Sequence, residues 1–224
     1  MNKKIWWYLG GFVALVAVFY FLLFAGTDYY KVKLPVVNYV KEFKFTDQDG
    51  EQITERNVEG KVYVAEYFFT TCKGICPKMN ANMKTIFEKY KTVDNFAIVS
   101  HTCMPEIDSV PLLKNYQAKM MSADEIKNYP DKWFFVTGNK DSLYRMARES
   151  YLLDNDKNNS QNIADQFIHT QFFALIDKQR RVRGIYDGLK KDELEKLSID
   201  IGELLKETKD NHSGIVSPFS NAPA

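Results

Sequence analysis

The hydrophobic and polar residues follow three patterns along the chain, and the first of them is an unbroken apolar stretch near the N-terminus. Residues 5–26, IWWYLGGFVALVAVFYFLLFAG, contain no charged residue. At about 1.5 Å rise per residue such a stretch spans roughly 30 Å, the thickness of a bilayer core. We therefore predict a transmembrane anchor over residues 5–26. A cleaved signal peptide is the alternative, although its apolar region is usually only about 7–15 residues long.

The charges around this stretch predict its orientation. Lys3 and Lys4 lie within the short N-terminal segment 1–4 and favour a cytoplasmic N-terminus, whereas Lys31 and Lys33 beyond the span weaken that bias. The rest of the chain would then lie outside the cytoplasm. We expect a single-pass protein of a bacterial-type inner membrane, with its folded part on the periplasmic side.

A second pattern, the alternation or short apolar run of strands, begins after the anchor. Residues 41–54, KEFKFTDQDGEQIT, alternate around Asp49-Gly50, which indicates a β-hairpin. Residues 61–70, KVYVAEYFFT, form a β-branched and aromatic run that fits a buried central strand. Similar runs predict further strands at residues 95–100, 132–138, 170–177 and 181–188.

The third pattern is helical. Beyond Pro77, apolar residues recur at spacings of three and four: Met79, Met83, Ile86, Phe87 and Tyr90. The same periodicity predicts helices at residues 109–120, 140–151 and 191–208. The order ββ, then repeated βα, then ββα indicates an α/β sandwich with a mixed sheet. We therefore predict a linker at 27–40, one domain at 41–207 and a disordered tail at 208–224.

Composition narrows the class of protein only a little. The chain has 224 residues, of which 45% are hydrophobic, so it can bury a sizeable core within one domain. Its 30 basic and 29 acidic residues give a formal net charge of +1. Such a balance provides no field to attract a nucleic acid, and we expect no nucleic-acid partner.

Two of the three cysteines suggest a chemical function. Cys72 and Cys76 lie in TTCKGICP, where the predicted central strand gives way to a helix. Ligands of open α/β sheets bind beyond such strand ends. Side chains four positions apart on a helix lie about 5–6 Å from each other, so this pair could hold one metal ion or form one disulfide. The helix N-terminus predicts a lowered thiol pKa. Two buried structural cysteines are the alternative, which the polar neighbours disfavour.

Two thiolates make a soft site, which selects Cu(I) over harder divalent ions and needs a third ligand. The chain has three histidines. His101 ends a predicted strand, His212 lies in the tail, and His169 follows the irregular segment 152–166, which could carry it over the cysteine pair. A lone histidine is more often structural or solvated than a ligand, so at this point the third ligand stays open.

The stretches YFFTTCKGICPKM, VSHTCMPEID, WFFVTG and FIHTQFFALIDKQRRVRGIYDG, in this order, resemble the Sco (SCO/SenC) family of membrane-anchored copper proteins. The resemblance extends from about Phe43 to Leu205. It implies a thioredoxin-like fold, copper as Cu(I) with Cu(II) as a second candidate, and a part in building the dinuclear copper centre of cytochrome c oxidase. Carried over residue by residue, it implies that Cys72, Cys76 and His169 bind the copper.

The implied partners are the membrane, the copper-binding subunit of the oxidase, and an upstream copper donor or thiol reductant. The chain also departs from the family pattern. Met104 stands where the family usually has an aspartate, whereas the second acidic residue is kept as Asp108, a candidate auxiliary group. His101 and Cys103 stand where apolar residues are common. Cys103 is either a small core residue or a resolving thiol or auxiliary ligand.

Two functions of different classes remain open. A copper metallochaperone would hold copper and pass it on by ligand exchange. A membrane-tethered thiol–disulfide oxidoreductase would instead use Cys72 and Cys76 to reduce the copper-ligand cysteines of its client. Reductases of the thioredoxin type have Cys-x-x-Cys, whereas three residues intervene here, and a reductase does not need His169. We therefore expect a metallochaperone rather than an enzyme.

Overall fold

The computed structural model describes residues 3–24, 34–154, 168 and 170–207, which fall into two units considered separately. In the first unit, helix α1 (Lys3–Phe24) has exposed side chains over the window Lys4–Phe21. This helix is long and apolar enough to cross a membrane, and a signal sequence would have the same properties. The predicted disordered tail and most of the irregular segment 152–166 lie outside the described residues.

The second unit is built on a six-stranded sheet with the strand order β1-β8-β7-β4-β5-β6. Strands β4, β5 and β6 run parallel, whereas β7, β8 and β1 each pair antiparallel with their neighbour. The predicted mixed sheet is therefore confirmed. Phe68 pairs with Thr102, so the carboxyl ends of β4 and β5 meet at one edge. The strands are β1 (Asn38–Tyr39), β4 (Val62–Phe68), β5 (Phe96–Thr102), β6 (Trp133–Val136), β7 (Phe172–Ile176) and β8 (Arg181–Asp187).

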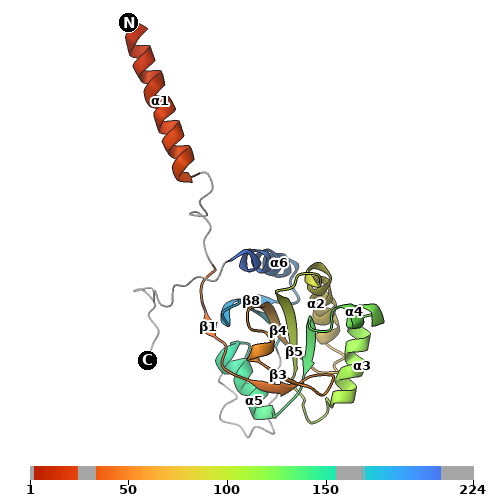
Figure 1. The fold of residues 1–224 in the computed structure, drawn as a ribbon. Coiled ribbons are helices and arrows are strands. Elements are labelled where there is room, and N and C mark those ends of the chain that lie inside the picture. Colours follow the sequence, from red (N-terminus) through yellow and green to blue (C-terminus); the bar gives the residue numbers. More distant parts are fainter. Residues whose placement is uncertain (1–2, 25–33, 155–167, 169, 208–224) are drawn as a thin grey trace, which may run out of the picture. The chain divides into compact units, whose positions relative to one another are not determined.

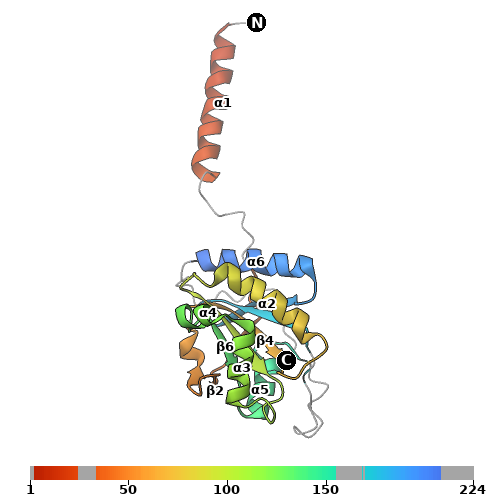
Figure 2. The same ribbon diagram turned by 90° about the vertical axis from the view of Figure 1, so that its right-hand side faces the viewer.

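Helices cover both faces of this sheet, as Figures 1 and 2 show. Every residue of β4 and β5 is buried, which requires a layer on each side. One face carries α2 (Cys76–Tyr90), α3 (Val110–Met120) and α6 (Lys191–Lys206). The other carries α5 (Lys140–Arg145), the π-helix η3 (Met146–Ser150), and the predicted hairpin of β2 (Lys44–Thr46) and β3 (Gln52–Thr54), with the short 3-10 helix η2 (Glu55–Asn57). All five periodic apolar residues of α2 are buried, as predicted.

Strand β1 lies within the segment that the sequence assigned to a linker, residues 27–40. The backbone N–H groups of Val37 and Val40 donate to Val182 and Arg180 on or beside β8, both at 2.8 Å, and Val40 is buried. The chain thus joins the sheet before residue 41. An edge strand of two residues is held by backbone hydrogen bonds, and it is too short to show the alternation that predicts a strand.

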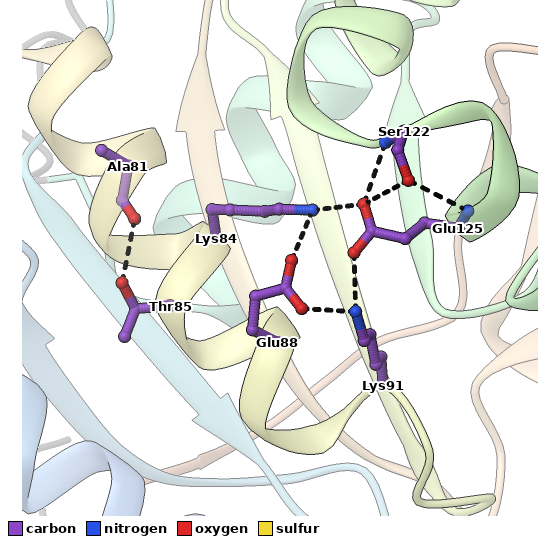
Figure 3. Close-up of polar contacts among 7 residues, drawn as sticks. All are labelled: Ala81, Lys84, Thr85, Glu88, Lys91, Ser122 and Glu125. Atoms are coloured by element: carbon purple, nitrogen blue, oxygen red, sulfur yellow. Dashed lines mark hydrogen bonds and ion pairs between the residues drawn. The ribbon is translucent and has the colours of Figure 1, made fainter.

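A ring of opposite charges joins α2 to the short helix α4 (Ala123–Asn128), as Figure 3 shows. The hydrophobic pattern of the sequence does not predict this helix. Glu125 accepts from Lys84 at 2.6 Å and from Lys91 at 2.8 Å, and Glu88 closes the ring by pairing with both lysines. Burial opposes ionisation, but the two lysines hold the pKa of Glu125 well below its usual range. The ring fixes the C-terminal half of α2 and leaves its N-terminus at the sheet edge.

Candidate metal centre

The cysteine pair lies between the end of strand β4 and the first turn of helix α2. Strand β4 ends at Phe68, and α2 begins at Cys76 with a proline in its first turn, where the missing N–H costs no hydrogen bond. Between them, the backbone N–H of Cys72 donates to the carbonyl of Phe69 at 3.2 Å. Cys72 is half-buried and Cys76 is buried, and both thiols are free.

The thiol of Cys72 lies near enough to Cys76 to affect its ionisation. Burial, followed by the neighbouring Cys72 thiol, raises the pKa of Cys76 to about 12. The predicted lowering at a helix N-terminus is therefore wrong for Cys76. A helix dipole contributes only about 0.3–1 kcal/mol, which is less than the cost of burying a charge. In the metal-free protein Cys76 keeps its proton at neutral pH, and a metal ion must displace it.

The predicted third ligand, His169, lies outside the described residues. On either side of it, Ile168 and Thr170 are buried, and the chain then enters β7, which runs antiparallel to β4 with Ala174 beside Ala65. The start of β7 therefore lies near the end of β4, from which the cysteine loop leaves. Among the described residues, no group of three or more histidine, cysteine or acidic side chains could hold a metal ion. The described residues thus bring two soft donors, Cys72 and Cys76, to the same turn.

Asp108 holds the cysteine loop in place. Its fully buried carboxylate accepts from the backbone N–H of Thr70 at 3.2 and 3.3 Å, from the Thr70 hydroxyl and from the hydroxyl of Thr102 at the end of β5. Both carboxylate oxygens are therefore occupied by donors of the protein. Because Thr70 lies only two positions before Cys72, these contacts suit a residue that positions the cysteine loop.

We expect Asp108→Asn to loosen this loop, because the amide places N–H donors where the two threonines already donate. The loss should be about 1–3 kcal/mol of unfolding free energy, accompanied by faster alkylation of Cys72. Denaturant unfolding and alkylation kinetics would measure the two effects. Glu106→Gln is the matched control. Glu106 lies with Asp108 in the segment between β5 and α3, but it is exposed and pairs with Lys140. Unchanged stability and alkylation in Asp108→Asn would contradict the positioning role.

Cys103 follows β5 directly and lies at the same sheet edge, where its backbone N–H donates to the carbonyl of Phe68 at 2.9 Å. Its side chain is only 2% exposed and belongs to the core cluster on the face opposite α2. The hydroxyl of Tyr144 donates to its carbonyl at 2.7 Å. Burial first, and then the charges of Cys76 and Asp108, raise its pKa well above the usual range. These surroundings favour the core role over the auxiliary-ligand role.

The Cys103→Val variant tests whether Cys103 is a core residue or an auxiliary ligand. Valine fills the same apolar space, so we expect unchanged copper stoichiometry and an unchanged rate of copper loss to a chelator, with a change in stability below about 1.5 kcal/mol. Chelator competition and thermal unfolding provide the measurements. A tenfold change in the rate of copper loss would show instead that the third sulfur takes part at the site.

The side chain of His101, like that of Cys103, lies on the face of the sheet opposite α2. It is fully buried, its ring stacks on Tyr67 with centroids 5.0 Å apart, and its Nδ1 lies 3.3 Å from the carbonyl oxygen of Glu66. Burial lowers the pKa of His101 to about 4, so the ring is neutral at physiological pH. Of the two histidines that the sequence placed in the domain, His101 is thus a core residue.

The sheet order, the helical layers and a thiol pair at a strand-to-helix turn define a mixed α/β protein of the thioredoxin-like class. The model of the SCO1/SenC family matches residues 33–205. The chain therefore belongs to the SCO1/SenC family.

Individual relatives agree with this assignment. The chain is 30% identical over 189 residues to the SCO1 protein homolog of Bacillus subtilis, covering 82% of this chain and 91% of the relative. A SCO1/SenC family lipoprotein from Bacillus anthracis shares 27% identity with a TM-score of 0.62, over 75% of this chain and 96% of that one. BsSco, a Sco family cytochrome c oxidase assembly protein in which a disulfide switch was identified, shares 29% identity with a TM-score of 0.60, over 76% and 96%.

Proposed function

We propose that this chain is a copper metallochaperone that binds copper through Cys72, Cys76 and His169 and delivers it to the dinuclear copper centre of cytochrome c oxidase. The observation that carries the proposal is the pair of free, neighbouring thiols at the strand-to-helix turn of a SCO1/SenC family member. Thiolates are ligands that select Cu(I). The assignment of BsSco to oxidase assembly supports the proposed client.

The unequal burial of the two cysteines suits transfer by ligand exchange. Cys76 is buried at the start of α2, whereas Cys72 is half-buried in the loop before it. An incoming thiolate of the client can reach copper from the side of Cys72 and replace that ligand first. Cys76 would retain the ion until a second client ligand binds, so copper need not pass through solvent.

Metal content tests the proposal. The reduced full chain, purified in detergent, should retain one Cu(I) per chain after excess copper is removed, and should not retain Mg²⁺ or Ca²⁺ under the same treatment. A chain that keeps no copper would contradict the proposal. Mixing the loaded chain with a soluble copper-binding domain of the oxidase should then transfer the ion.

A thiol–disulfide oxidoreductase is the second candidate, because two free, neighbouring thiols at one strand-to-helix turn are the groups that such a reaction needs. In that reaction Cys72 would attack a client disulfide, and Cys76 would release the reduced client by closing the Cys72–Cys76 disulfide. The raised pKa of Cys76 slows this second step, since the thiolate is the nucleophile. Reduction of a client disulfide by the metal-free chain that is undiminished in His169→Ala would favour this function.

We further propose that α1 anchors the domain on the periplasmic side of an inner membrane. Lys3 and Lys4 precede the apolar span and favour a cytoplasmic N-terminus. A periplasm-dependent reporter fused after Ala224 should therefore be active, and a cytoplasm-dependent reporter should be inactive. A mature chain that begins near Gly26 would show that the segment is cleaved.

A further inference from the structure

Two exposed lysines flank the candidate metal centre. Lys73 lies in the loop between the two cysteines, and Lys78 lies in the first turn of α2, two positions after Cys76. Among the described residues, neither lysine has an ion-pair or hydrogen-bond partner for its side chain. By contrast, Lys84 of the same helix pairs with Glu125 at 2.6 Å. Two positive charges therefore stand beside the thiol pair without a counter-charge of their own.

The acidic residues of the neighbouring segment do not pair with these lysines. This segment, residues 103–109, joins β5 to α3 and lies against the cysteine loop, because Asp108 accepts hydrogen bonds from the backbone N–H and the hydroxyl of Thr70. Asp108 is completely buried, so its carboxylate is not presented at the surface. Glu106 is exposed, but it pairs with Lys140 at 3.2 Å. Within the cysteine loop and this segment, the exposed charge that stays unpaired is positive.

An exposed apolar residue lies on the same segment. Ile107 directly precedes Asp108 and is 45% exposed, and its backbone N–H donates to the carbonyl of Met104 at 3.0 Å. A single exposed apolar side chain is ordinary on a protein surface. Here, however, it belongs to the segment that Asp108 ties to the cysteine loop. An apolar contact with a polar rim is the usual arrangement of a protein–protein interface.

We propose that Lys73, Lys78 and Ile107 form a docking surface for the protein that receives copper, and that this partner presents carboxylates around its own copper-binding thiols. The inference deepens the proposed function and rests on it. Charge complementarity favours an acidic partner, because opposite charges speed the encounter of two proteins and like charges suppress it.

Docking of this kind suits a carrier that has to release its partner after each transfer. Attraction between exposed charges raises the association rate more than it strengthens the complex, so the two proteins can separate again. The transfer itself exchanges no electrons. For each S–Cu bond that breaks on this chain one forms on the partner, and the protons that leave the partner's thiols pass through solvent to Cys72 and Cys76.

A pair of synthetic peptides tests the charge of the partner. Both carry two cysteines and one leucine; four glutamates surround the cysteines in one peptide, and four glutamines in the other. The reduced full chain, loaded with Cu(I) in detergent, should transfer copper to the acidic peptide about tenfold faster at low salt than Lys73→Gln/Lys78→Gln does. With the neutral peptide the two chains should agree within about twofold. At about 1 M salt, where the Debye length falls to about 3 Å, the tenfold difference should disappear.

The matched control makes the same change of charge elsewhere. Lys119 at the end of α3 and Lys127 in α4 are exposed, and neither forms an ion pair with another described residue. Helix α4 lies beside the C-terminal half of α2 (Figure 3), whereas the cysteines lie at its N-terminus. Lys119→Gln/Lys127→Gln should therefore transfer copper to the acidic peptide within about twofold of the parent rate. A tenfold loss in this control as well would reveal a general effect of net charge and contradict the docking surface.

A copper-free measurement separates docking from metal binding. A labelled acidic peptide with serines in place of its cysteines should bind the copper-free parent at low salt, measured as a rise in fluorescence anisotropy. It should bind Lys73→Gln/Lys78→Gln about fivefold more weakly. Ile107→Ser should weaken the binding of the acidic and the neutral peptide by a similar factor, and added salt should leave that factor unchanged, because an apolar contact is not screened.

The outcomes separate this inference from the proposed function. If the parent and Lys73→Gln/Lys78→Gln each retain one copper and transfer it to the acidic peptide at equal rates, the docking surface is overturned while the chaperone function stands. If the parent retains no copper, the proposed function fails, and the anisotropy measurement still decides whether acidic peptides dock. Salt-dependent self-association of the copper-free parent that is lost in the lysine variant would assign the lysines to a contact between two copies and overturn the inference.

Discussion

Cys76→Ser should lower the affinity for Cu(I) by at least about a thousandfold, or about 4 kcal/mol, while the chain stays folded. The substitution replaces a soft thiolate by a hydroxyl, which stays protonated at neutral pH and is a poor ligand for Cu(I). Because Cys76 is buried at the first turn of α2, no water-exposed group can take its place easily. Cys72→Ser should have an effect of the same order.

Competition with a Cu(I) chelator would measure these affinities, and thermal unfolding would verify the fold. Cys103→Ser is the matched control, since it makes the same chemical change in the one remaining cysteine, and it should leave the affinity within about tenfold of the parent. His169→Ala should weaken copper binding strongly, whereas His212→Ala should not. Full affinity in His169→Ala would remove this histidine from the site.

Mild oxidation of the metal-free chain should produce a Cys72–Cys76 disulfide, and this form should take up no Cu(I). Both thiols are free and lie between the end of β4 and the first turn of α2, so we expect a movement of the loop to bring their sulfurs to bonding distance. The reaction transfers two electrons from the thiols to the disulfide of the oxidant and releases two protons. Both sulfur donors are consumed in the bond, which explains why the loss of copper binding should be complete.

Peptide mapping would identify the bonded cysteines, and copper titration before and after treatment with a reductant would measure the loss and its reversal. Cys103→Ala should form the same disulfide and is the control. A disulfide from Cys103 to either other cysteine would reassign the redox pair. Copper uptake by the oxidised chain at the level of the reduced one would contradict thiolate ligation altogether.

Long, strongly patterned elements of the fold could be predicted from the sequence. Strands β4 and β5 are continuous apolar runs, and α2 shows its buried face as a periodic set of residues, because each is held by side chains that pack against the core. Strand β1 and helix α4 could not be predicted in the same way. Strand β1 is held by backbone pairing with β8. Helix α4 is held by a capping box and by ion pairs between Glu125 and lysine side chains such as Lys84 of α2.

For the site, the sequence by itself determined which residues carry soft donor atoms and that two of them lie at a strand-to-helix turn: Cys72 and Cys76. Only the tertiary structure decided how those groups behave, because pKa values and contacts depend on burial and on residues distant along the chain. It places Asp108 beneath the loop as an acceptor for Thr70, and it raises rather than lowers the pKa of Cys76. It also buries Glu66 of β4 with the Ser100 hydroxyl as its hydrogen-bond donor, since a glutamate within an apolar run reveals its partners only once the sheet and its helices are packed.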